Sequence, residues 1–87
     1  MLPLNMAILD VFTDGSVNSR ADVQEKLRAN YGNFKAFKDA SMDDALQTAM
    51  SNGLIAEDHY EVESDGYVKI WYKSDKDMID VINSYIR

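Results

Sequence analysis

The sequence lacks several kinds of residue, and each absence narrows its chemistry. It has no cysteine, which excludes disulfides, thiol catalysis and thiolate metal sites. It has one histidine, no Gly-x-Ser-x-Gly elbow and no phosphate loop, so we expect no enzyme, no cofactor and no bound metal ion. It also lacks a signal-like start and any apolar run of membrane-spanning length, so we expect a cytoplasmic protein without a membrane partner.

Positive charge is missing from one long stretch of the chain. Residues 20–38 contain five cations and two acids, whereas residues 39–68 contain no lysine or arginine and eight carboxylates: Asp39, Asp43, Asp44, Glu57, Asp58, Glu61, Glu63 and Asp65. The net charge of the whole chain is −6. This balance disfavours duplex DNA as a partner without excluding it. The carboxylates favour a basic protein partner, or they serve only solubility.

The composition is that of an ordinary folded domain. Of the 87 residues, 46% are hydrophobic and 28% are charged, which argues against a disordered chain. We therefore expect a single domain over residues 1–87.

Apolar residues at helical spacing predict three helices in the first part of the chain. The patterns Ser19–Asp22 and Ser41–Asp44 resemble capping boxes and mark the starts of the second and third helices. Gly15, Gly32 and Gly53 are placed to end the three helices.

The spacing changes from helical to alternating after Ile55. A strand through residues 59–63, a turn at Ser64–Gly66 and a return strand at Tyr67–Lys73 predict an antiparallel hairpin. Residues 16–18 are suited to a minimal strand. A third capping box at Ser74–Asp77 opens a last helix.

The predicted order is helix, helix, helix, hairpin, helix, which makes the fold class α+β. Residues 45–55 resemble the pattern of bacterial winged-helix regulators in which the recognition helix closes on Gly-Leu-Ile. The strand Tyr67–Lys73, followed at once by a helix, resembles the PadR-like arrangement. The resemblance covers nearly the whole chain. It implies a winged helix with a three-helix core, a two-stranded antiparallel wing hairpin and an added C-terminal helix.

In winged helices that bind DNA, the exposed side of the third helix enters the major groove. Here that side presents Asp43, Asp44 and Gln47 with no cation beside them, so it is expected to repel phosphate and to suit a protein partner. A plainer interpretation is that the two aspartates only stabilise the positive end of the helix.

The return strand offers a second candidate surface. Tyr67, Lys69, Trp71 and Lys73 alternate onto the outer face of the hairpin, where aromatic rings beside lysines suit a protein contact or single-stranded nucleic acid. Alternatively, the last helix folds over this side and buries Trp71.

Two further sets bear on the alternative functions. Nucleic acid could contact the basic cluster, or the cluster is a solvated helix face: Arg20, Lys26, Arg28, Lys35 and Lys38. A dimer could form through a seam on the last helix: Ile79, Ile82, Tyr85 and Ile86. His59, Glu61 and Glu63 resemble metal ligands by type, but alternate strand residues stand too far apart to share one ion.

The sequence therefore favours a non-catalytic winged-helix module that binds protein through an acidic third helix and an aromatic hairpin. The alternative is a small DNA-binding transcriptional regulator that acts as a homodimer. A third hypothesis is an accessory protein whose carboxylates occupy a DNA-binding partner.

Overall fold

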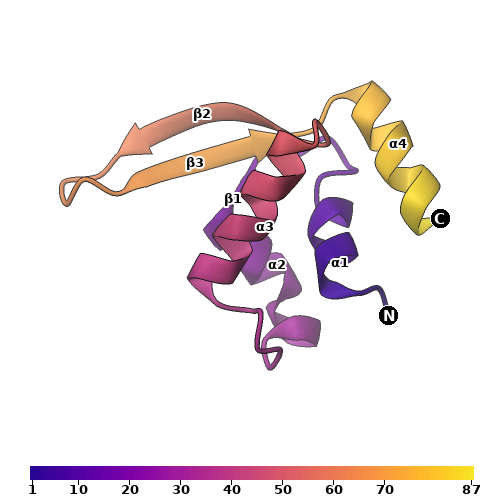
Figure 1. Ribbon diagram of the computed structural model, residues 1–87, viewed down its shortest axis with the longest axis horizontal. Helices are drawn as coiled ribbons and strands as arrows, with labels where there is room; N and C mark the ends of the chain where they lie inside the picture. Colours follow the sequence, from indigo (N-terminus) through magenta and orange to yellow (C-terminus); the bar gives the residue numbers. More distant parts are fainter.

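The computed structural model describes residues 1–87 and has an α+β fold with four helices and one antiparallel sheet of three strands (Figure 1). In chain order the elements are α1 (Leu4–Asp10), β1 (Asn18–Ser19), α2 (Arg20–Tyr31), α3 (Asp39–Ser51), β2 (Ala56–Val62), β3 (Val68–Lys73) and α4 (Lys76–Ile86). The predicted order of three helices, a hairpin and a last helix is confirmed.

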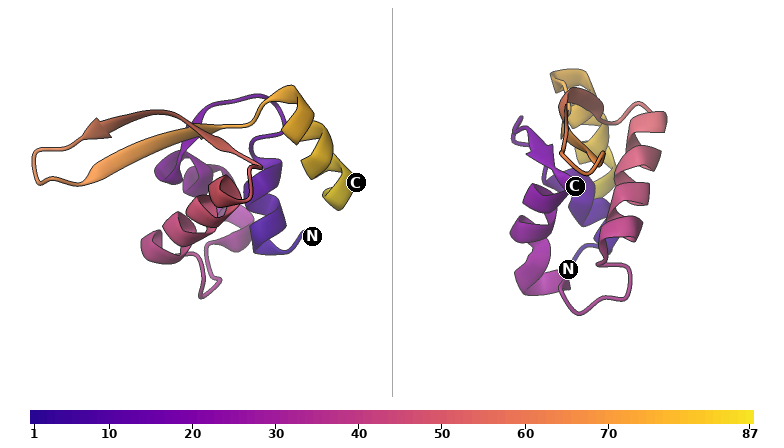
Figure 2. Two further views of the ribbon diagram at one scale, coloured as in Figure 1. Left: turned by 45° about the horizontal axis from the view of Figure 1, so that its top comes forward. Right: turned by 90° about the vertical axis from the view of Figure 1, so that its left-hand side faces the viewer.

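The core lies where the first three helices meet beneath the base of the hairpin. Phe12, Val23, Met42 and Leu46 are completely buried, and Tyr72 brings the hairpin into the same cluster. In the right-hand view of Figure 2, α2 and α3 lie on opposite sides below the hairpin. The apolar residues at helical spacing thus hold three helices under one end of a two-stranded ribbon.

The start of α2 follows the sequence prediction. Ser19 Oγ accepts a hydrogen bond from the Asp22 amide at 3.2 Å, and Asp22 Oδ2 accepts one from the Ser19 amide at 2.9 Å. Each side chain satisfies a backbone donor that has no partner within the helix, so the predicted capping box is confirmed.

The predicted capping box at Ser41 is wrong. Helix α3 begins at Asp39, three residues earlier than a cap at Ser41 would place it, and its cap residue Lys38 makes no side-chain capping bond. Asp39 instead places a carboxylate in the first turn, where negative charge is favourable, and it accepts a hydrogen bond from Gln24 Nε2 at 3.2 Å. Contacts with α2 therefore set this helix start, and local capping does not.

The start of α4 also differs by one residue from the prediction. Asp75, and not Ser74, caps the helix, because Asp75 Oδ1 accepts a hydrogen bond from the Met78 amide at 2.9 Å. Ser74 is buried and donates its hydroxyl to the Leu54 carbonyl at 2.8 Å. This bond ties the end of the hairpin to the exit of α3.

The end of α3 is a glycine stop, as predicted. Gly53 has φ +76°, a conformation that favours glycine. Its amide donates to the Met50 carbonyl, and the Leu54 amide donates to the Ala49 carbonyl, both at 3.0 Å. These two bonds form a Schellman motif, which satisfies carbonyls at the helix end and turns the chain into the hairpin.

The sheet has one strand more than the predicted wing. Strand β1 pairs Asn18 with Tyr72 and Ser19 with Trp71, so the strand order is β1-β3-β2. The minimal strand expected at residues 16–18 therefore forms, but it lies later, at Asn18–Ser19.

A β-bulge at Asp58 interrupts the pairing of β2 with β3. Glu57 pairs with Tyr72, and the next paired residue, His59, pairs with Trp71. Asp58 therefore has no partner on β3. The extra residue changes the alternation of the strand. Glu57 and Tyr60 consequently point to one face of the hairpin, and His59 points to the other.

Helix α4 packs on α1 and closes one end of the molecule (Figure 1). Ile82 is completely buried inside the chain, so this residue of the predicted dimer seam is not available at the surface. Tyr85 is 61% exposed, whereas Ile79 and Ile86 are half-buried. None of the four helices combines the length and the apolar character needed to cross a bilayer.

Replacing Ser19 by alanine should lower the free energy of unfolding by about 1 kcal/mol, because the capping bond to the Asp22 amide is lost. Ser41→Ala is the matched control, since Ser41 lies within α3 and caps nothing. We expect Ser41→Ala to change stability by no more than about 0.5 kcal/mol. Urea denaturation followed by circular dichroism measures both. Equal losses in the two variants would contradict the assigned helix starts.

Candidate functional site

The outer face of the hairpin is a stacked cluster around Trp71. The His59 ring lies parallel to the Trp71 ring with centroids 4.5 Å apart, and Lys69 Nζ lies 4.9 Å from the Trp71 ring centroid. Glu61 pairs with Lys69 across the strands. Trp71 is thus half-buried, and these neighbours on its own hairpin cover it in part. The prediction of an outer face carrying Trp71 and Lys69 is consistent with this arrangement.

The bulged residue connects this cluster to Lys73. Asp58 Oδ2 lies 2.7 Å from His59 Nδ1, and Asp58 Oδ1 lies 3.4 Å from Lys73 Nζ. The hydrogen bond with His59, followed by the contacts with Lys73, holds the pKa of Asp58 below the ordinary value. Nδ1 of His59 is therefore already engaged. No three histidine, aspartate or glutamate side chains of the chain converge on a metal position.

Arg20 joins α2 to α3 at the other predicted surface. Its Nη1 lies 3.0 Å from Asp39 Oδ1 and donates to Gln24 Oε1 at 2.7 Å, while its Nε lies 3.0 Å from Asp43 Oδ1. The buried Nε–H is not aimed at an acceptor, so the contact with Asp43 is an ion pair and not an aligned hydrogen bond. The Arg20 side chain is only 18% exposed.

The surroundings of Arg20 keep it charged. Burial acts to lower the pKa of Arg20, but Tyr67, Asp43 and Asp39 outweigh it and raise the pKa above the usual value. Arg20 is nevertheless occupied by two carboxylates from α3. Arg20, the first residue of the predicted nucleic-acid cluster, is therefore already paired and mostly buried, which disfavours a contact with phosphate.

The other cations of the predicted cluster differ in their contacts. Lys26 Nζ donates to Asn18 Oδ1 at 2.7 Å, and Arg28 pairs with Glu25 at 3.6 Å while its guanidinium lies 5.6 Å from the Phe37 ring centroid. The residues of the cluster that are exposed and form no ion pair within 4.0 Å are Lys26, Lys35 and Lys38.

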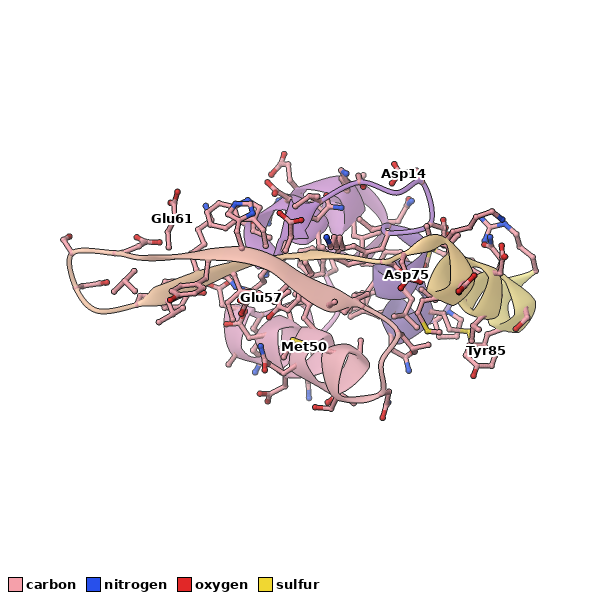
Figure 3. All side chains as sticks on the ribbon, turned by 90° about the horizontal axis from the view of Figure 1, so that it is seen from above. Asp14, Met50, Glu57, Glu61, Asp75 and Tyr85 are labelled. Carbon is pink, nitrogen blue, oxygen red and sulfur yellow. The ribbon has the colours of Figure 1, made fainter.

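The exposed side of α3 is acidic and continues onto the hairpin. Gln47 Nε2 donates to Tyr72 Oη at 2.8 Å. Burial raises the pKa of Tyr72, and the nearby charges of Asp43 and Glu57 raise it further against the lowering effect of the Gln47 bond. Figure 3 shows Glu57 on the side of the hairpin that faces α3, whereas Glu61 points to the opposite side.

We call this region the α3 acidic surface, which consists of Asp39, Asp43, Asp44 and Glu57. Asp44 and Glu57 are exposed and form no ion pair, and Arg20 is the cation that contacts the other two. Glu57 could not be assigned to this surface from the sequence, because regular alternation would place it with His59.

The hairpin extends beyond the helices (Figure 1), and apolar side chains in its distal half are exposed. Tyr60 is 59% exposed, Val62 63%, Val68 45% and Tyr67 40%. The Tyr67 hydroxyl accepts a long hydrogen bond of 3.4 Å from Arg20 Nη2. The structure thus divides the predicted partner-binding residues. Lys69, Trp71 and Lys73 belong to the cluster around Trp71 and Asp58, whereas Asp43, Asp44 and Gln47 lie on α3. Tyr67 contacts Arg20.

Comparison with protein-family models, with curated proteins and with solved structures found no match to this chain.

Exchanging His59 for glutamine should raise the pKa of Asp58 towards its ordinary value of 3.8, because the largest lowering contact is lost. A carboxyl titration followed by NMR measures this shift, and Lys73→Met should produce a smaller one. Since the pKa of Asp58 is depressed by folding, its stabilising effect is present above the ordinary value and is lost as the pH falls through the lowered one. An unchanged pKa in His59→Gln would disprove the assigned bond.

The contacts of Arg20 predict that it contributes more to the stability of the fold than Arg28 does. Arg20→Met should lower the free energy of unfolding by about 1–2 kcal/mol, because Asp39 and Asp43 then face each other without a cation. Arg28→Met is the control, because Arg28 makes one longer pair at the surface and should cost less than about 1 kcal/mol. Chemical denaturation measures the free energy of unfolding of both variants. Equal losses would contradict a structural role for Arg20.

Proposed function

We propose that this chain is a non-catalytic winged-helix module that binds a protein partner through the α3 acidic surface and the neighbouring hairpin. In this proposal α1, α2 and α3 form the helical core, β2 and β3 form the wing, and α4 is the added helix. The arrangement of the elements and the hairpin that extends beyond the helices support this assignment.

The charge of the α3 acidic surface is the observation that favours a protein partner over DNA. Four carboxylates lie on the α3 acidic surface, and the cation that contacts them, Arg20, is already paired with two of them. The surface that would enter the major groove is therefore negatively charged and would meet a polyanion at close range. A basic protein surface is the complementary partner.

A DNA-binding dimer has less support. Two of the residues expected to anchor phosphate, Arg20 and Arg28, form ion pairs with acids of the chain. The seam expected on the last helix contains Ile82, which is buried by the chain itself. Lys26, Lys35 and Lys38 remain as exposed cations, but Lys26 lies on α2, and Lys35 and Lys38 lie in the connection before α3.

Fluorescence anisotropy with a labelled mixed-sequence duplex tests the exclusion of DNA. We expect no binding by the wild-type chain at moderate ionic strength, because few phosphates would be neutralised. Affinity that falls steeply with added salt would contradict the proposal, since that dependence reports phosphate contacts.

The partner surface is tested by affinity capture with the immobilised chain and quantitative mass spectrometry. Asp44→Lys should lose a protein that the wild type retains, because Asp44 is an exposed and unpaired carboxylate of the α3 acidic surface. Asp77→Lys, which reverses an exposed charge on α4, should retain it. Identical retention by both variants would remove the α3 acidic surface from the proposed function.

A further inference from the structure

Strand β3 has one edge that is mostly unpaired. Along its other edge β3 pairs with β2 from Val68 to Lys73, but β1 covers only Tyr72 and Trp71. After Ser19 the chain turns into α2, so the edge from Lys69 towards the turn faces no strand (Figure 1). An uncovered edge of this kind can accept a strand from another chain.

The hydrogen bonds of the turn fix the direction of the Val68 backbone. The Glu63 amide donates to the Tyr67 carbonyl at 2.8 Å, so these two residues form a hydrogen-bonded pair. Because such pairs alternate with non-hydrogen-bonded pairs in an antiparallel ladder, the next pair, Val62 with Val68, directs its backbone groups outward. Both the amide and the carbonyl of Val68 therefore point to the open edge.

The open edge borders a groove between the N-terminal ends of α2 and α3. This groove has a volume of about 300 Å³, and its lining includes Arg20, Asp43, Gln47, Val68, Ile70 and Tyr72. Two of its lining residues, Arg20 and Asp43, form an ion pair. The groove therefore offers backbone groups on one side and an α3 carboxylate on the other.

The edge of β2 is less suited to pairing. It contains the β-bulge at Asp58 and carries three charged residues, Glu57, Asp58 and Glu61. Bulges and edge charges are features that prevent strand addition. The uncovered part of the β3 edge, from Val68 to Ile70, has no bulge and carries one charged residue, Lys69.

We propose that an extended segment of the protein partner pairs antiparallel with the open edge of β3 and places a lysine or arginine opposite Val68. This inference rests on the protein-binding function proposed above and specifies how the partner is held. The segment would continue the line of β1, which already runs antiparallel to β3.

The direction of the side chain opposite Val68 is the reason to expect a lysine or arginine at that position of the partner. The residue opposite Val68 points to the same face as Val68, Ile70 and Tyr72, which is the face towards α3. A long basic side chain would lay its methylenes on Val68 and Ile70 and bring its charge to Asp43, which lines the same groove. The residue opposite Lys69 points to the other face, where a second cation would be repelled.

Charge also argues against a second copy of this chain as the occupant. Edge-to-edge pairing around Val68 would bring the turn of the second copy, with Glu63 and Asp65, towards Arg20 and Asp43. Two acids would then approach a groove whose cation is already compensated. With a net charge of −6 on each copy, self-pairing is disfavoured.

The probe is a short fluorescein-labelled peptide rich in threonine and valine with one central lysine. Two matched peptides replace the central lysine by glutamate or place lysines on both sides of a central threonine. Anisotropy titrations should show binding of the first peptide and at least about tenfold weaker binding of the other two, because close charges of like sign oppose pairing. Equal affinity for all three would overturn the proposed register and charge preference.

Two proline variants test the edge itself. Val68→Pro removes the amide that faces the groove but no bond between β2 and β3, and it should raise the Kd at least about fivefold through the lost donor. Val62→Pro is the matched control, because it removes an outward amide on the edge of β2 and should leave the Kd unchanged. Equal effects of the two variants, or dimers of the wild type that Val68→Pro dissociates, would overturn the proposal.

A second pair of variants keeps the test decisive if Val68→Pro does not fold. Asp43→Asn should reduce the preference for central lysine over glutamate at least about fivefold, because Asp43 lines the groove. Asp44→Asn should leave this preference unchanged, because Asp44 does not line it. If a captured protein is lost by Asp44→Lys but still retained by Val68→Pro, strand addition is refuted and the proposed function stands. Loss of the Asp44 dependence would instead refute the proposed function.

Discussion

The ion pair between Arg20 and the two aspartates of α3 is the contact on which the surface of this protein depends. Arg20 is the first residue of α2, and through Asp39 and Asp43 it joins the start of α2 to the start of α3. Arg20 also lines the groove beside β3 and compensates part of the acidic charge of α3. The same contact pairs a cation that a phosphate could otherwise bind, so in the proposed function this interaction disfavours anionic ligands.

The elements and their order could be predicted because local rules determine them. The apolar spacing of α1 to α3, the Ser19–Asp22 capping box and the glycine stop at Gly53 involve residues only a few positions apart. Where a distant residue decides, the sequence prediction was wrong. Ser41 has the pattern of a cap, but contacts across α2 and α3 start the helix at Asp39 instead. Ser74 resembles a cap as well, but its hydroxyl bonds the Leu54 carbonyl twenty residues earlier.

The candidate site could be predicted only in part, for the same reason. The acidic character of α3 and the outward direction of Trp71 and Lys69 follow from residue types and alternation. The pairing of Arg20 with α3 joins residues separated by a whole helix and a connection, and no local pattern reports it. The bulge at Asp58 is also invisible in the sequence, because an extra strand residue has no required type there.

The bulge has a consequence for how the hairpin could diverge. Because Asp58 resets the alternation, the acids of β2 are divided between two independent faces: Glu57 belongs with α3, whereas Glu61 belongs with Lys69 and Trp71. If the strand kept its length but paired without the bulge, Asp58 would lie opposite Tyr72, and Glu57 would lie opposite Lys73 on the other face. A change of pairing at this one position would therefore exchange Glu57 for Asp58 beside α3 and leave the residues from His59 onward where they are.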